Sequence, residues 1–119
     1  GFVIWDKISH LPTMADCEYA WTSFDKNAKI CPCHRTNILG EERIHICQKP
    51  VALYEWLLTN YAKKGDKILD THVGSGSSLI ACYRLGFDFI GFEIDEEYYK
   101  KAKERLEREK AQVRFNWGC

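Results

Sequence analysis

The stretch at residues 70–78, Asp-Thr-His-Val-Gly-Ser-Gly-Ser-Ser, combines an acid, a histidine, hydroxyl groups and a pair of glycines. Gly74 and Gly76 are separated by one residue, and a backbone without Cβ atoms can approach a bound ligand closely. The pattern lacks the third glycine of the dinucleotide fingerprint and the lysine of a phosphate-binding loop. This disfavours ATP and, less strongly, NAD, and leaves a nucleoside ligand or a plain tight turn.

Glu93, at the end of the apolar run 88–93, is the second residue that could contact a ligand. In a strand–helix–strand unit, an acid at the end of the second strand can accept hydrogen bonds from both hydroxyls of a ribose. Together with the glycine loop, it predicts an adenosine cofactor without phosphates, which points to S-adenosylmethionine. The alternative is a strand-to-helix turn followed by a surface glutamate, because a glycine pair alone is a weak signal.

The segments around these residues alternate between strand and helix. We expect a short strand at 67–71, a helix at 77–86 that Gly86 closes, a strand at 88–93 and a charged helix at 96–112. This order is typical of a parallel sheet, in which the glycine loop and the end of the second strand meet at one edge. A strand-like run at 113–117 follows.

The first half of the chain is expected to hold two neighbouring strands, at 1–7 and 18–24, and a helix from Pro50 to Gly65. Residues 25–47 have no sustained periodicity and predict an exposed loop, which is functional or disordered in most proteins. This segment contains several potential zinc ligands. Their spacing is poor for zinc and we expect no metal, since only one residue separates the first pair and the second pair is His-x-Cys: Cys31, Cys33, His34, His45 and Cys47.

The composition sets broad limits on function. The 119 residues predict a single domain, and 17 basic residues balance 17 acidic ones. A net charge of zero gives no global attraction to nucleic acid or membrane, so any DNA affinity must come from a local patch. With six cysteines but no secretory signal and no long apolar segment, we expect a reduced, cytoplasmic protein that does not contact a membrane.

Three stretches carry a resemblance to a known family: GFVIWDK, HICQKPVALYEWLL and the run from Ile68 to Leu106. They resemble the carboxyl-terminal part of the amino-group DNA methyltransferases, which methylate N6 of adenine or N4 of cytosine, and in particular their phage-like branch. The resemblance covers nearly the whole chain. It implies an α/β fold: a partial Rossmann-like, S-adenosylmethionine-dependent methyltransferase fold, with a mostly parallel sheet and a hairpin from the N-terminal strands.

The resemblance also implies site residues. The positions that match the family's cofactor site are Gln48, Lys49, Pro50, Asp70, His72, Gly74, Ser75, Gly76 and Glu93. Gln-Lys-Pro would begin a helix that closes over the methionine end, and His72 stands where the family usually has phenylalanine. The residues that could contact phosphates of double-stranded DNA, unless they belong to a merely solvated loop, are Lys29, Arg35 and Arg43.

The family's catalytic motif, Asp/Asn/Ser-Pro-Pro-aromatic, is not in this chain, because no two of its three prolines are adjacent. We therefore assign no catalytic residue and expect a truncated methyltransferase domain over 1–119 that is inactive alone. A parallel strand normally pairs on both edges, so we expect self-association or a chain that supplies the missing half. The alternatives are a non-catalytic cofactor-binding or partner subunit, and a truncated prophage remnant.

Overall fold

The structure, a computed structural model, describes residues 1–35, 44–45 and 48–112. The strand-like run at 113–117 lies outside these residues. Three strands, β1 (Phe2–Asp6), β2 (Cys17–Trp21) and β3 (Lys29–Pro32), form one sheet in the order β2-β1-β3. β1 runs antiparallel to β2 and parallel to β3. The predicted N-terminal hairpin is therefore confirmed.

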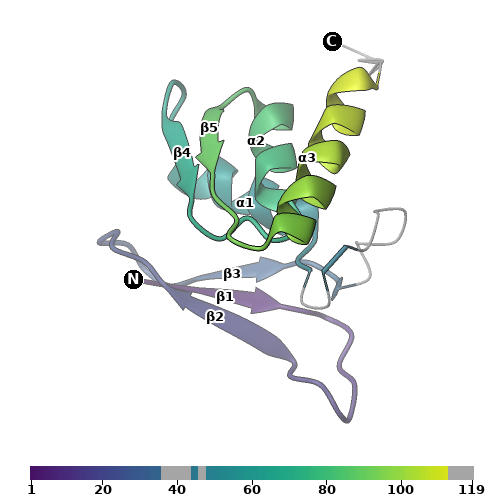
Figure 1. Ribbon diagram of the computed structural model, residues 1–119. Helices are drawn as coiled ribbons and strands as arrows, with labels where there is room; N and C mark the ends of the chain where they lie inside the picture. The colour runs from purple at the N-terminus through teal and green to yellow at the C-terminus, as the bar shows by residue number, and fades with distance from the viewer. Residues whose placement is uncertain (36–43, 46–47, 113–119) are drawn as a thin grey trace.

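A second sheet contains β4 (Lys67–Asp70) and β5 (Asp88–Gly91), which are parallel and place Leu69 opposite Ile90. Three helices complete the described structure: α1 (Val51–Tyr61), α2 (Ser77–Leu85) and α3 (Glu96–Ala111). In Figure 1 the three-stranded sheet lies below the unit of β4, β5, α2 and α3. The α/β fold and the predicted order of the second half are confirmed, although the strands form two sheets and not one.

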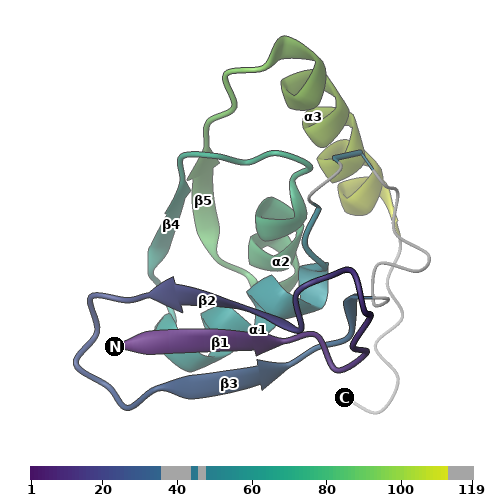
Figure 2. The same cartoon turned by 90° about the horizontal axis from the view of Figure 1, so that it is seen from below.

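The helix α1 joins the two sheets and is buried on two sides. One side, with Leu53, packs with Trp5 and Cys31 of the three-stranded sheet. The other side, with Val51, packs with Ile80 of α2 and with α3. Figure 2 shows α1 between the three-stranded sheet and α2.

The prediction of an exposed loop over 25–47 is wrong for its first part, because β3 forms at Lys29–Pro32. Cys31 and Cys33 are 1% and 5% exposed, and Trp5 donates a hydrogen bond from Nε1 to the Cys33 carbonyl at 2.6 Å. The strand pairs with β1 far away in sequence, so its stability comes from a partner that the local pattern does not reveal.

The first predicted helix ends earlier than expected, at Tyr61 and not at Gly65. Gly65 adopts φ +90° in a turn where the Lys63 amide donates to Asp66 Oδ2 at 2.8 Å. The glycine thus serves the turn into β4. At the end of α2, by contrast, Gly86 has φ +79° and caps the helix as predicted.

No helix within the described ranges is long and apolar enough to cross a lipid bilayer.

Candidate functional site

A pocket of about 430 Å³ lies at the carboxyl edge of β4 and β5. Its walls come from five parts of the chain: the glycine loop at 72–75, the residues after β5, the first turn of α3, the segment before α1, and α1 itself. The pocket brings together six of the nine predicted cofactor residues: Gln48, Lys49, His72, Gly74, Ser75 and Glu93.

Glu93 follows β5 and connects it to the glycine loop. Its Oε1 accepts a hydrogen bond from the Gly74 amide at 2.7 Å, and its Oε2 accepts one from the Asp95 amide at 3.0 Å. The bond from Asp95, followed by the bond from Gly74, holds the pKa of Glu93 below its ordinary value. Each carboxylate oxygen has a second lone pair, so the ionised group can still accept hydrogen bonds from two hydroxyls.

The two glycines of the loop face different neighbours. At Gly74 (φ +58°), an added Cβ would meet only the ring of His45, at 3.9 Å, on the pocket side. At Gly76 (φ +88°), an added Cβ would lie 3.3 Å from the Cβ of Ala102 in α3. Gly74 therefore keeps the pocket open, whereas Gly76 does not line it and instead allows α3 to pack against the loop.

Asp70 and Pro50 support the pocket without lining it. Asp70 accepts hydrogen bonds from the His72 amide, at 2.9 Å to Oδ1, and from the Ser78 hydroxyl at Oδ2. It thereby fixes both ends of the glycine loop. Pro50 is fully buried in an extended conformation at the N-cap of α1. The position of Pro50 sets the direction in which the preceding residues approach the pocket.

The segment before α1 is held by side chains from two directions. Gln48 Oε1 accepts a hydrogen bond from the Ile44 amide at 2.8 Å. The Nζ of Lys49 lies 3.4 Å from Glu18 Oε1, and the other oxygen of Glu18 lies 2.9 Å from the Nζ of Lys7. Glu18 on β2 thus links the three-stranded sheet to the pocket, a contact that the sequence did not predict.

Three aromatic rings of the pocket had no predicted role in ligand binding. The rings of His45 and Tyr98 are in contact, with centroids 4.5 Å apart and ring planes tilted by 40°. Tyr54 of α1 also lines the pocket, and burial raises the pKa of its hydroxyl to about 12.

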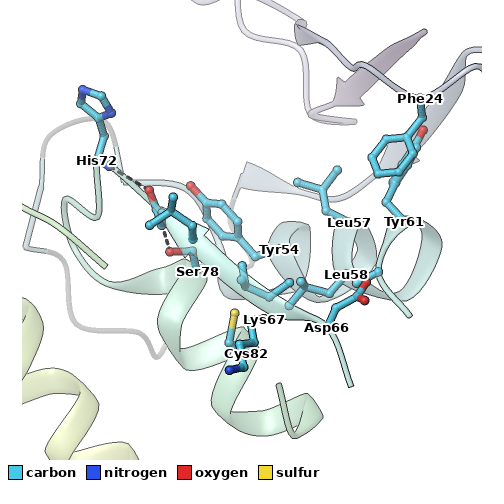
Figure 3. Close-up of a pocket in the computed structure, with 14 residues that line it drawn as sticks. Phe24, Tyr54, Leu57, Leu58, Tyr61, Asp66, Lys67, His72, Ser78 and Cys82 are labelled. Atoms are coloured by element: carbon cyan, nitrogen blue, oxygen red, sulfur yellow. Dashed lines mark hydrogen bonds between the residues drawn. The ribbon is translucent and has the colours of Figure 1, made fainter. Parts of the chain in front are cut away.

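A second cavity, of about 490 Å³, runs beside β4 and is mainly apolar. Figure 3 shows His72 at one end of this cleft and Phe24 and Tyr61 at the other. Within the described residues β4 has β5 as its only neighbour, so its other edge is open. Tyr54 and His72 line both cavities.

The comparisons with known proteins agree with this geometry. A family model described as DNA methylase, of the N6/N4 type, matches residues 4–104. This chain belongs to the N6/N4 DNA methylase family. The chain is also 46% identical over 65 residues to the type II methyltransferase M2.DpnII of Streptococcus pneumoniae, and 45% identical over 65 residues to M.HpaI of Haemophilus parainfluenzae. Each match covers 55% of this chain, but only 24% and 21% of those relatives.

The similarity to solved structures extends over most of this chain. The complex of M1.HpyAVI with SAM matches with a TM-score of 0.71 and 27% identity, over 89% of this chain and 61% of that one. TTHA0409 of Thermus thermophilus, crystallised with S-adenosyl-L-methionine, shares the fold, with a TM-score of 0.59 and 24% identity, over 94% of this chain and 54% of that one.

Two of the three basic residues predicted to contact DNA are described by the structure, and they lie near opposite ends of β3. Lys29 is exposed at the start of β3. Arg35 lies beyond the other end of that strand and donates hydrogen bonds to Met14 Sδ and the Ala15 carbonyl, both at 3.0 Å. Arg43 lies outside the described residues. Arg35 thus holds the connection between β1 and β2, and its role toward DNA stays a prediction.

The potential zinc ligands lie in the segment 31–47 of this chain. Cys47 lies outside the described residues, and no group of three potential metal ligands converges in the part that the structure describes. Burial, together with the neighbouring Cys33, raises the pKa of Cys31 to about 11, which keeps this thiol protonated.

Gly65 and Gly76 have different surroundings, so replacing each of them by alanine should cost different amounts of stability. Gly65→Ala places a side chain at φ +90° with nothing within 4 Å, so it should cost only the left-handed strain, about 1–2 kcal/mol. Gly76→Ala adds overpacking against Ala102, for a further loss of about 1–3 kcal/mol. Urea unfolding followed by circular dichroism measures both, and equal losses would contradict the assigned contact with α3.

Proposed function

We propose that this chain binds S-adenosylmethionine in the 430 Å³ pocket and is the cofactor-binding half of a DNA methyltransferase. The observation that carries the proposal is the position of Glu93 beside Gly74. The ionised Glu93 carboxylate can accept hydrogen bonds from the two hydroxyls of a ribose. Gly74 has no Cβ, so the sugar can approach the backbone closely. The pocket also has the size of a small-molecule site.

The other pocket residues fit the remaining parts of this cofactor. The neighbouring rings of His45 and Tyr98 offer an aromatic surface of the kind that a purine contacts. Lys49 and Gln48 offer a cation and an amide for the charged methionine end. When bound, the cofactor supplies a methyl group on a sulfonium sulfur, and the chain's own residues bind and orient it.

By family, the methyl group passes to an exocyclic amino nitrogen in double-stranded DNA, and we favour N6 of adenine over N4 of cytosine. Enzymes of this kind flip the base into a pocket of polar and aromatic side chains. This chain lacks the Pro-Pro-aromatic motif that would form such a pocket. Cofactor binding alone positions no nucleophile, so we propose that the chain is inactive by itself.

The open edge of β4 supports an association with further polypeptide. The edge borders an apolar cleft, and on the outer face of the small sheet Leu69 and Ile90 are 63% and 62% exposed. Unpaired strands beside exposed apolar side chains favour pairing with another chain. A second copy and a separate chain with the missing motif are both compatible with this edge. A non-catalytic subunit and a phage-derived remnant stay the alternatives.

Cofactor binding should depend on Glu93. Calorimetric titration with S-adenosylmethionine is expected to show saturable binding that Glu93→Ala weakens by about tenfold or more, because hydrogen bonds to a charged acceptor are lost. Glu97→Ala is the matched control, since Glu97 is an exposed acid in the first turn of α3 and does not line the pocket.

The pKa of Glu93 adds a second criterion to this titration. Because that pKa is lowered, the carboxylate stays ionised from neutral pH down to its ordinary value of 4.5. The ratio of wild-type to Glu93→Ala affinity should therefore be constant over this range and fall only at lower pH. Absence of binding by the wild type would remove the cofactor from the proposal.

Methyl transfer should be absent when this chain acts alone. Duplex DNA of mixed sequence, incubated with the purified chain and cofactor labelled on the methyl group, is expected to gain no label because the base pocket is missing. A complete family member in the same assay is the positive control. Label incorporation by this chain would show that another group binds the flipped base.

The exposed edge of β4 predicts association. Sedimentation velocity over a range of protein concentrations should show species heavier than 13.9 kDa that grow with concentration. Leu69→Lys introduces a charge at an exposed position of the edge strand and should reduce this association. A clean monomer at high concentration would count against self-association and favour a separate partner chain.

A further inference from the structure

The helix α3 buries a cation behind the glycine loop. Arg105 is 6% exposed, although it lies in the charged run that forms α3. The buried residues of α3 include Ala102 and Leu106, and Arg105 lies beside them. A buried guanidinium is costly unless its hydrogen bonds are satisfied, so its partners indicate what it holds in place.

Two hydrogen-bond acceptors of Arg105 lie in the glycine loop and at the start of α2. Its Nη1 donates to the Ser75 carbonyl at 3.1 Å and to the Ser77 hydroxyl at 2.9 Å. The hydroxyls of Ser75 and Ser77 are themselves 3.3 Å apart, and both residues are buried. Arg105 thus binds the loop from the side opposite the pocket.

These contacts fix a turn that faces the pocket. The Gly76 amide donates to the Val73 carbonyl at 3.1 Å, which closes a β-turn with Gly74 and Ser75 at its centre. The Ser75 carbonyl and the Gly76 amide belong to one planar peptide and point in opposite directions. Holding this carbonyl toward Arg105 therefore keeps the amide on Val73 and maintains the turn.

The Gly74 side of the same turn is held near the N-terminus of α3. Glu93 accepts the Gly74 amide, and its second oxygen accepts the amide of Asp95, the N-cap residue of α3. Asp95 in turn accepts the Tyr98 amide at 3.0 Å. The loop is therefore fixed between the start of α3 and Arg105, with Ala102 packed against Gly76 between them.

We propose that Arg105 is a positioning residue of the cofactor site, which holds the turn at 73–76 in the conformation that presents Gly74 and Ser75 to the ligand. The role for the ligand rests on the proposed cofactor function, whereas the role in holding the turn does not. A guanidinium suits this task because its planar donors bind a carbonyl and a hydroxyl together in a fixed direction.

Hydrogen exchange of the ligand-free protein tests the turn. Arg105→Ala should speed exchange of the Gly74 and Gly76 amides relative to amides inside α1. The matched control is Arg84→Ala, which removes another arginine between α2 and α3, bound to Glu109 at 2.6 Å, away from the loop. Arg84→Ala should leave the exchange rates of the Gly74 and Gly76 amides, relative to those of amides inside α1, unchanged. Unchanged loop exchange in Arg105→Ala, or the same change in Arg84→Ala, would overturn the proposal.

If Arg105→Ala does not fold, Arg105→Lys serves in its place. Lysine keeps the charge, but a flexible ammonium cannot reproduce the fixed pair of donors. The same selective increase in exchange at Gly74 and Gly76 is then expected. Wild-type exchange at both amides would instead show that any buried cation is sufficient, which overturns the specific role of the guanidinium.

Titration with S-adenosylmethionine tests the link to the ligand. Arg105→Ala should weaken binding by about tenfold, as expected for the loss of a charged hydrogen bond. Guanidinium chloride at a concentration below denaturation should restore affinity, whereas potassium chloride at equal ionic strength should not. A variant that is only less stable would be weakened further by guanidinium, so that result would overturn the positioning role.

The two experiments separate the two proposals. If the wild type binds no cofactor, the proposed function fails, and the exchange measurement still decides whether Arg105 holds the turn. If the wild type binds cofactor and Arg105→Ala binds equally well, the proposed function stands and the positioning role is overturned.

Discussion

The burial of α1 on two opposite sides is the constraint on which the rest of the structure depends. The two sheets share no strand pairing in the described residues, and α1 packs with residues of both. Residues 48–50 lead directly into this helix, so its docking also determines where Gln48 and Lys49 meet the glycine loop. One helix thereby sets both the relative position of the sheets and one wall of the pocket.

The second half of the chain was predictable because its signals are local. Gly86 ends α2 in a left-handed conformation, and Asp95 caps α3 through its own side chain. The strand β3 gives no comparable signal. In β3 the hydrophobic Ile30 is 60% exposed, whereas Cys31 is 1% exposed. The local sequence therefore does not show which side of β3 is buried, and the pairing with β1 determines it.

The site was predictable to the extent that each residue acts through its own type and position. Gly74 and Glu93 meet at one edge because the ends of parallel strands do so. The partner of Gly76 could not be predicted, because it depends on the packing of α3. Arg105 was hidden in a helix that alternates charges, where nothing local separates a buried cation from its solvated neighbours.

Tyr54 and His72 line both the pocket at the ends of β4 and β5 and the cleft beside β4. Whatever polypeptide fills the cleft would contact the same two side chains from the other side. Occupancy of the two cavities would then be thermodynamically linked: a segment that changes affinity for the ligand must have its own affinity changed by the ligand to the same degree. In this arrangement a ligand of the pocket would act as an effector of assembly, and assembly would regulate how long that ligand stays bound.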